Sequence, residues 1–385
     1  MKRIIFITIA FFLIILFQSC SKKNRALDSE SMQCNQKIHV LSDINELTSL
    51  DSLISRITIV PLETNEDCLI KNIFAAKLND DLLFINSDRR QLLVYDLNGK
   101  YIRDIGSRGQ GPGELLEIRD FIFTNEGNIE ILDFKKIEIY SLEGEHLGTK
   151  KYDFMGKDIY CNPMNFCQSS HGYYVWGGTI GLTDNKLLKQ SYMMHHVDPD
   201  MKIDGHYFSA HYGDGGTMDR FKHYQNYIIV IPSSIDYNIY QIDPKGNISV
   251  RYCLDFGKYG VNSNKKIDLS STPIENYITR ISNYYETDRF IHLNFNYKNN
   301  MYSMFYSKAE QQSYIKSLAK PFETELRFYP IIGTYNDQMI AIIEASWIKA
   351  ELERMSPEGI KKWELEQYHQ LDEDSNPMLI FYTLK

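Results

Sequence analysis

The stretch that decides the fold is DLLFINSD (residues 81–88), followed by LLVYDL (92–97), the turn Asn98-Gly99 and KYIRDI (100–105). The apolar runs have the length of β-strands, and polar turn residues end them. Asn-Gly is a strong hairpin signal, because both residues tolerate the positive φ of a tight turn. The segment is therefore predicted to form antiparallel strands joined by short turns.

The same pattern recurs along the chain. The strands at 128–133 and 137–142 end in Glu143-Gly144, so Gly144 takes the place that Gly99 has in the first copy. Further strand pairs lie at 172–176 with 192–197, 227–231 with 237–242, 290–295 with 302–306, and 338–343 with 378–384. Six such units, spaced like propeller blades, predict an all-β protein: a six-bladed β-propeller with four strands per blade.

One segment ahead of the repeat completes the predicted propeller. Residues 57–62 (ITIVPL) form a strand ahead of the first unit. We expect this strand to complete the last blade, because an open ring would expose sheet edges. Pro61 suits an edge strand, where its missing N–H is not needed.

The last blade is predicted to carry a helical insertion at residues 346–371. Ser356-Pro357-Glu358 is a helix start, and apolar residues follow on one face of the helix. The insertion is expected either to pack as a cap on the last blade or to cover one mouth of the ring. A second short helix is predicted over residues 272–283.

The N-terminus has the layout of an export signal. Lys2 and Arg3 precede an apolar run at residues 4–17, which is shorter than the ~20 residues of a membrane-spanning helix. Residues 1–19 are therefore predicted to be a signal peptide. The sequence LFQSC (16–20) is similar to a bacterial lipobox, which would make Cys20 a lipidation site; the alternative is a plain secretory leader. Residues 20–54 are predicted to be a lipid-anchored tether and lead-in, flexible at 21–36, ahead of the propeller at 55–385.

Composition excludes some classes of protein and partner. With 43% hydrophobic residues the chain can build a core, so wholesale disorder is excluded. The net charge of −8 argues against nucleic acid as a partner. Besides Cys20 there are five cysteines, an odd number that rules out a complete set of disulfides. Cys161 and Cys167 are close enough in sequence to bridge, but their pairing stays open.

The sharpest local motif is IGSRGQGPGE (105–114), supported by IVPLET (59–64) and NPMLIFY (376–382). Over residues 55–385 these motifs resemble the bacterial six-bladed β-propeller lipoproteins, which are related to NHL-repeat propellers. The resemblance implies fold and location more than activity. The segment Ser21-Lys22-Lys23-Asn24 is basic, where an acidic run in related lipoproteins can direct display on the outer face. The resemblance therefore favours an anchor in the outer membrane of a Gram-negative bacterium that faces the periplasm.

The glycine motif is interpreted as a structural crossover between blades. It lacks the Gly-Lys-Ser/Thr ending of a phosphate loop, and proline removes an amide that a phosphate would need. The predicted structural residues are Gly106, Gly109, Gly111, Pro112 and Gly113. Arg108 and Glu114 flank the loop and are candidates for a ligand mouth, with ordinary solvated charges as the alternative.

A histidine-rich stretch is a candidate metal site. Its histidines are His195, His196, His206, His211 and His223, with aspartates among them. Their spacing matches no metal motif, so a polar loop between blades is the preferred interpretation. The pair Ser170-His171 is interpreted as a turn. No catalytic, cofactor-binding or metal-binding residue is predicted, and no cofactor is expected.

The favoured function is a non-enzymatic, monomeric lipoprotein of the cell envelope that binds a glycan, a peptide or a partner protein at a propeller mouth. One alternative is a hydrolase or lyase whose metal ligands are dispersed around the propeller axis. A third hypothesis is a scaffold of an envelope complex. A metal held in the central channel would favour the enzyme, and an exposed apolar face on the helical insertion would favour the scaffold.

Overall fold

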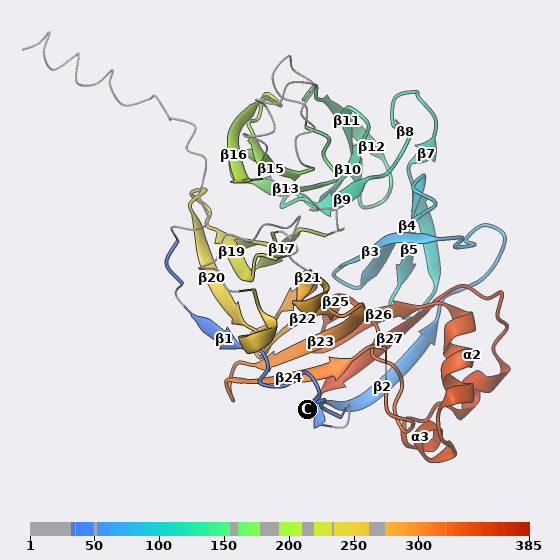
Figure 1. The fold of residues 1–385 in the computed structure, drawn as a ribbon. Helices are drawn as coiled ribbons and strands as arrows, with labels where there is room; N and C mark the ends of the chain where they lie inside the picture. Colours follow the sequence, from blue (N-terminus) through green and yellow to red (C-terminus); the bar gives the residue numbers. More distant parts are fainter. Residues whose placement is uncertain are drawn as a thin grey trace, which may run out of the picture.

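The computed structural model describes residues 32–34, 36–49, 52–154, 161–177, 192–209, 219–232, 235–261, 274–319 and 321–385. These residues form a ring of six antiparallel sheets around a central axis, which confirms the predicted six-bladed β-propeller (Figure 1). Each blade has four strands, and the fourth blade carries one additional strand.

The strands of each blade run in order from the axis to the periphery. The innermost strands are β3 (Ile73–Asn79), β9 (Asp120–Phe123), β13 (Asn165–Ser169), β17 (Phe221–Tyr224), β21 (Thr279–Glu286) and β25 (Ile331–Tyr335). The second strands are β4 (Leu82–Ser87), β10 (Asn128–Asp133), β14 (Gly172–Trp176), β18 (Tyr227–Val230), β22 (Phe290–Tyr297) and β26 (Gln338–Ile343). The third strands are β5 (Gln91–Asp96), β11 (Lys136–Ser141), β15 (Tyr192–Val197), β19 (Asn238–Ile242), β23 (Asn300–Ser307) and β27 (Met378–Leu384). The outermost strands are β6 (Tyr101–Ile105), β12 (His146–Lys151), β16 (Ile203–Ser209), β20 (Ile248–Asp255), β24 (Gln312–Ser317) and β2 (Ile54–Pro61).

The turn between β5 and β6 forms for the reason that the sequence indicates. Gly99 has φ +85°, and its N–H donates to the carbonyl of Asp96 at 3.0 Å. The Asp96 carboxylate also accepts from the N–H groups of Asn98 and Lys100, at 3.0 and 2.8 Å. The aspartate therefore satisfies the turn backbone while the glycine supplies its left-handed conformation.

The apolar core lies between neighbouring blades. Six clusters of buried side chains fill the six interfaces around the ring. The second and third strands of the blades supply most of these buried side chains, because both faces of these strands are covered by neighbouring blades. Burial of apolar surface is the main favourable term in folding, so these interfaces hold the ring together.

The ring closes as predicted, with strand β2 completing the last blade. It pairs antiparallel with β27 from Ile54 opposite Leu384 to Pro61 opposite Met378. Pro61 lies on the outer edge of the blade, where no partner needs its missing N–H. The two ends of the propeller are thereby joined in one sheet.

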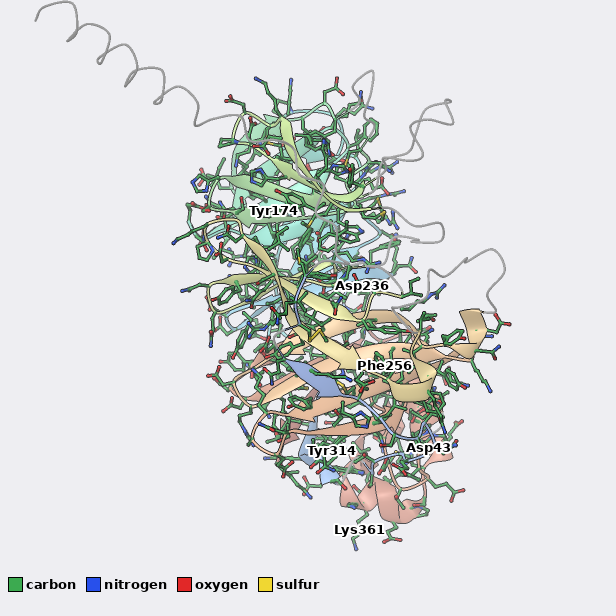
Figure 2. The ribbon with its side chains drawn as sticks, turned by 60° about the vertical axis from the view of Figure 1, so that its left-hand side comes forward. Asp43, Tyr174, Asp236, Phe256, Tyr314 and Lys361 are labelled. Atoms are coloured by element: carbon green, nitrogen blue, oxygen red, sulfur yellow. A yellow bond between two sulfur atoms is a disulfide. The ribbon has the colours of Figure 1, made fainter. Side chains whose placement is uncertain are left out.

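The helical insertion is confirmed as a cap on the last blade. It consists of α2 (Ala345–Arg354), α3 (Pro357–Lys362) and η6 (Glu366–Gln370). Its apolar side chains, including Ile348, Leu352 and Trp363, belong to the cluster between blades five and six. Lys361 on this insertion and Tyr174 in blade three lie at opposite ends of the molecule (Figure 2). Within the described ranges, no helix is long and apolar enough to cross a membrane.

The short helix predicted over 272–283 is wrong. Among the described residues of this segment, only η5 (Ile274–Asn276) is helical, and the chain then enters β21, the innermost strand of blade five. Ile278 and Ile281 are buried against blades four and five. Their spacing fits a helix, but Ile281 lies in β21, whose pairing with β22 has register shifts, and Ile278 directly precedes that strand. An isolated 3-10 turn, η4 (Gly257–Tyr259), also follows the outer strand of blade four.

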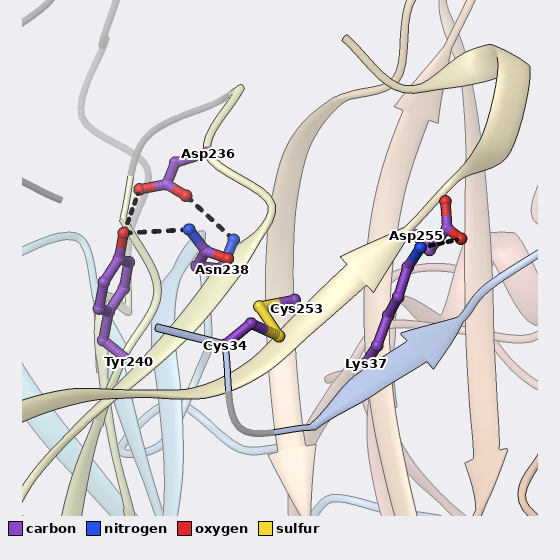
Figure 3. Close-up of a disulfide and its surroundings, with 7 residues drawn as sticks. All are labelled: Cys34, Lys37, Asp236, Asn238, Tyr240, Cys253 and Asp255. Carbon is purple, nitrogen blue, oxygen red and sulfur yellow. Dashed lines mark hydrogen bonds and ion pairs between the residues drawn. A yellow bond between two sulfur atoms is a disulfide. The ribbon is translucent and has the colours of Figure 1, made fainter. Parts of the chain in front are cut away.

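The lead-in before the propeller is fixed to blade four. Strand β1 (Lys37–His39) pairs parallel with β20 at the outer edge, and Cys34 forms a disulfide with Cys253 (Figure 3). Lys37 Nζ lies 2.9 Å from the carboxylate of Asp255. Cys34 falls in the predicted flexible tether, so the tether prediction is wrong at this residue. Cys161 and Cys167 do not bridge; both are free and buried.

Candidate functional site

The innermost strands of all six blades surround one cavity of about 490 Å³ on the propeller axis. This volume is in the range of small-molecule binding sites, about 300–1,000 Å³. Charged side chains enter the cavity from different blades: Lys77 from the first, Asp120 from the second, and Asp219 and Lys222 from the fourth. Residues that are far apart in the sequence therefore meet here, as in other sites built at the centre of a ring.

Lys77 and Asp120 together connect the inner strands of the first three blades at the cavity wall. Lys77 Nζ donates to the Asp120 carboxylate and to the carbonyl of Phe121, both at 2.7 Å. The other carboxylate oxygen of Asp120 accepts from the N–H of Phe166 in blade three at 3.1 Å. Asp120 is almost completely buried, so a network of hydrogen bonds compensates its charge.

Lys222 and Asp219 form the second charged pair of the cavity. They are ion-paired, and Lys222 Nζ lies 3.9 Å from the ring centroid of Tyr285 in blade five. Asp219 precedes β17 with φ +71°, a left-handed conformation that aspartate tolerates better than most residues. This backbone conformation brings its carboxylate to the lysine three residues later.

The pKa values in the cavity follow from burial and these pairs. Burial acts against the ionised form of Asp219, but Lys222 and the more distant Lys77 outweigh it and hold its pKa below the usual value. Burial likewise acts against the charged amine of Lys222, yet Asp219 raises the pKa of that amine. Burial lowers the pKa of His223, so that imidazole is neutral at neutral pH. The cavity thus holds permanent charges of both signs.

The glycine motif lies elsewhere, at the crossover from the outer strand of blade one to the inner strand of blade two. Two short parallel strands, β7 (Ser107–Arg108) and β8 (Glu114–Leu115), close the loop. Gly106 and Gly113 have φ +78° and +73°, which a residue with a Cβ adopts only at a cost.

Glu114 turns back into its own loop. Its carboxylate accepts from the N–H of Gly111 at 2.7 Å and occupies the space that a Cβ at Gly109 would need. Arg108 is exposed. Neither lines the axial cavity, so the structure does not bring them to this site. Their role as a separate ligand contact stays a prediction, as does lipidation of Cys20, which lies outside the described residues.

The histidine-rich stretch is dispersed in the structure. His195 Nδ1 lies 2.8 Å from His206 Nδ1, and His196 pairs with Asp204 at 2.5 Å. His223 alone among the described members reaches the axial cavity, and His211 lies outside the described residues. Across the part of the chain that the structure describes, no three His, Cys, Asp or Glu side chains gather as a metal site would require. Ser170 and His171 form a turn, with Ser170 Oγ donating to the Pro244 carbonyl at 2.7 Å.

Sequence reasoning did not find the cavity residues. The inner strand β17, with the sequence FKHY, is short and carries polar side chains toward the axis. It therefore lacks the apolar run that identified the second and third strands. The available signal was indirect: the segment just before each predicted strand pair must be the innermost strand of its blade. Charged residues in those segments, such as Lys77 and Lys222, could have been selected on that basis.

Comparisons with known proteins agree with this architecture. The family described as "Domain of unknown function (DUF4934)" matches residues 35–383, and the chain belongs to that family. A Bacteroides fragilis protein with the description "Putative exported protein" is similar in structure, with a TM-score of 0.70 and 18% identity, covering 91% of this chain and 99% of that one.

Weaker structural similarities extend to other proteins. The Neurospora crassa Pan2 WD40 domain has a TM-score of 0.38 and 10% identity, covering 76% of this chain and 93% of that one. BamB from Moraxella catarrhalis has a TM-score of 0.37 and 9% identity, covering 74% and 72%. Among curated proteins, no sequence matches this chain.

Proposed function

We propose that this protein is a lipid-anchored binding protein of the cell envelope that takes a small polar ligand, a glycan or peptide unit, in its axial cavity. The observation that carries the proposal is the convergence of six inner strands on one cavity of about 490 Å³ with charged walls. A propeller needs no charge on its axis to fold, because its apolar clusters lie between the blades. The pair of Lys222 and Asp219, which connects no inner strands of different blades, is available for recognition.

The protonation state of Lys222 favours binding over covalent chemistry. A lysine that acts as a nucleophile needs a depressed pKa, so that the free amine is present. Asp219 has the opposite effect, because it raises the pKa of Lys222. A protonated amine is a hydrogen-bond donor and a fixed charge, which suits ligand binding.

The envelope location rests on other features. The N-terminal 19 residues have the layout of an export signal, and Cys20 follows them. The Cys34–Cys253 disulfide is typical of oxidising compartments such as the periplasm. The similar protein from Bacteroides fragilis carries an export description. We therefore place this protein, as a monomer, on the periplasmic side of the outer membrane, held by lipid on Cys20.

The cavity is tested by filling it. Thr334 is exposed on inner strand β25 and lines the cavity, so Thr334→Trp should block it. The matched control is Lys151→Trp, on the exposed outer strand β12. Saturation-transfer NMR with mixtures of monosaccharides and dipeptides should detect binding to the wild type and the control, and lose it in Thr334→Trp. Equal signals from both variants would contradict binding in this cavity.

The anchor is tested separately. The full chain, expressed in a Gram-negative host, should partition into detergent with the membrane fraction. Cys20→Ser should be released in soluble form or remain as an uncut precursor, with a corresponding change in mass. Unchanged partitioning and mass would contradict the lipid anchor and leave the cavity experiment unaffected.

A further inference from the structure

We propose that the axial cavity selects uncharged sugars, either a neutral monosaccharide or the neutral end of a glycan, and that the balanced pair of Asp219 and Lys222 determines this selectivity. The inference rests on the proposed function, because it takes the axial cavity as the binding site. It deepens that function by naming the chemical class of the ligand and two specificity-determining residues.

The first observation is that each lysine of the cavity is balanced by an aspartate. Lys77 Nζ lies 2.7 Å from the carboxylate of Asp120, and Lys222 is ion-paired with Asp219. A ligand ion that enters the cavity loses water of solvation, and two neutral pairs provide no net opposite charge to replace it. The cavity therefore disfavours anions and cations alike.

The other titratable groups of the wall do not alter this balance. The Glu286 carboxylate has no exposure and is held by Arg251 and Lys308. Arg220 is only 3% exposed, and its guanidinium donates to backbone carbonyls of the protein. His223 is neutral at neutral pH, because burial lowers the pKa of its imidazole.

The second observation is that the two ion pairs leave hydrogen-bonding capacity for a hydroxyl group. Asp219 is 29% exposed and binds Lys222 through Oδ2, which leaves Oδ1 without a partner among the described residues. An ammonium group has three N–H donors, and Lys77 uses two of them, on Asp120 and on the Phe121 carbonyl. A ligand hydroxyl can therefore donate to blade four or accept from blade one while both ion pairs stay intact.

The rest of the wall suits the two kinds of surface that a sugar ring has. Amide and hydroxyl side chains line the cavity at Asn79, Asn125 and Thr334. The same cavity is lined by half-buried apolar side chains, namely Leu78, Ile122, Phe123 and Ile332. A pyranose carries hydroxyl groups around its edge and C–H groups on its faces, so it can contact both parts of the wall.

A ligand with charged ends, such as a short peptide, matches this wall less well. Its ammonium and carboxylate groups would need Asp219 and Lys222 as separate partners. These two side chains already bind each other, so the exchange would replace one ion pair by others and gain little. A hydroxyl group requires no such exchange.

The first experiment compares ligands that share a ring and differ in charge, by isothermal titration calorimetry on the mature protein. The neutral probes are D-glucose, D-galactose and D-mannose. The charged probes are the matching uronates, the matching hexosamines in protonated form, and glycylglycine. At least one neutral sugar should bind about tenfold more tightly than every charged probe, because an ion is desolvated without compensation. Binding of the neutral sugar should hardly depend on NaCl, since salt screens only charges.

The second experiment removes the balance of the pair in each direction. Asp219→Asn leaves Lys222 unbalanced, so the affinity ratio of uronate to neutral sugar should rise at least about tenfold over the wild type. Asparagine also tolerates the φ of +71° at this position, so the backbone conformation is kept. Lys222→Gln leaves Asp219 unbalanced and should raise the ratio of hexosamine to neutral sugar by about the same factor.

Both single variants should bind the neutral sugar more weakly than the wild type, because an unbalanced charge retains water that the sugar must displace. The double variant Asp219→Asn/Lys222→Gln restores neutrality, so the preference for the neutral sugar should return. That recovery also shows that the altered preference of the single variants does not come from misfolding. The control Lys245→Gln, in an exposed turn, should bind all probes as the wild type does.

Three results would overturn the inference. The first is a uronate, hexosamine or glycylglycine that binds the wild type as tightly as the neutral sugars or more tightly, which would leave the proposed function intact. The second is an unchanged ligand preference in both single variants, which would show that the pair does not determine selectivity. The third is a wild type that binds no neutral sugar; the Thr334→Trp comparison with dipeptides then decides independently whether the cavity is a binding site.

Discussion

Asn376 is predicted to hold the closed ring, and its replacement by alanine should be costly. The residue lies just before β27 and is only 1% exposed. Its side-chain amide donates to the carbonyls of Glu63 and Cys68, at 2.6 and 2.9 Å, and accepts from the N–H of Ile70 at 2.8 Å. These partners belong to the segment that leads from β2 in the last blade to β3 in the first. One side chain therefore joins the two blades between which the ring closes.

The magnitude follows from the partners that Asn376→Ala leaves behind. These three hydrogen bonds and a longer one from the amide to the Tyr95 hydroxyl, at 3.3 Å, are lost, each with a net value of about 0.5–1.5 kcal/mol. The N–H of Ile70 and the carbonyl of Cys68 are buried, so water does not readily replace the lost amide. An unsatisfied buried group costs about 1–3 kcal/mol. Because these terms overlap, we expect the free energy of unfolding to fall by about 3 kcal/mol.

The assay is urea unfolding followed by intrinsic fluorescence. Asn72→Ala is the matched control, because Asn72 is exposed and donates to the side chain of Asp88, so its loss should stay within about 0.5 kcal/mol. Asn376→Asp keeps an acceptor for Ile70 but turns an oxygen toward two carbonyls, so it should be at least as destabilising as alanine. A loss below about 0.5 kcal/mol for Asn376→Ala, with an unchanged m-value, would refute this account of closure.

Three further predictions concern the disulfide, pH and the glycine loop. The double variant Cys34→Ser/Cys253→Ser should unfold at lower urea, with a loss of about 2–4 kcal/mol, and reduction of the wild type should reproduce that loss. Burial lowers the pKa of His195 and His292 to about 3, so the unfolded chain binds more protons than the folded one below pH 6.5. The two histidines therefore stabilise the folded state fully above that pH, and their contribution to the free energy of unfolding falls by about 1.4 kcal/mol per pH unit and per histidine as the pH drops toward 3. His292→Asn should make the free energy of unfolding, measured with urea, depend less steeply on pH between 6.5 and 5. An unchanged pH dependence would contradict this. Gly106→Val should cost at least about 1–2 kcal/mol, because φ is +78° and a Cβ would meet Leu115, whereas the exposed control Arg108→Ala should stay within about 0.5 kcal/mol in thermal melts.

The second and third strands of the blades could be predicted because they are buried on both faces. Leu92, Leu93, Val94 and Tyr95 in β5 have no exposure, which gives the dense apolar run that the sequence shows. The closing strand could be predicted for a related reason, since Ile57 and Ile59 are buried against the last blade. In both cases the apolar residues that fill the interfaces are local in the sequence.

The innermost strands and the lead-in could not be predicted in the same way. Side chains of β17 and β21 face a polar cavity, so their sequences lack an apolar run, and part of β21 fits a helical period instead. The Cys34–Cys253 pairing spans 219 residues, and no spacing rule connects two such cysteines. The cavity itself depends on blade order around the ring, which brings Lys77 and Lys222 to one space only after closure.

The two charged pairs of the cavity differ in what they do for the fold, and this determines which of them can report on binding. Asp120 and Lys77 connect the inner strands of blades one, two and three, so a change at Lys77 would leave a buried carboxylate without its cation and would affect stability. Lys222 is paired with Asp219 on its own blade, three residues away, and the Asp219 side chain is 29% exposed. Loss of Lys222 therefore leaves an aspartate that water in the cavity can solvate. Since the apolar clusters between the blades are untouched by this change, reduced binding by Lys222→Gln at unchanged stability would report on recognition alone.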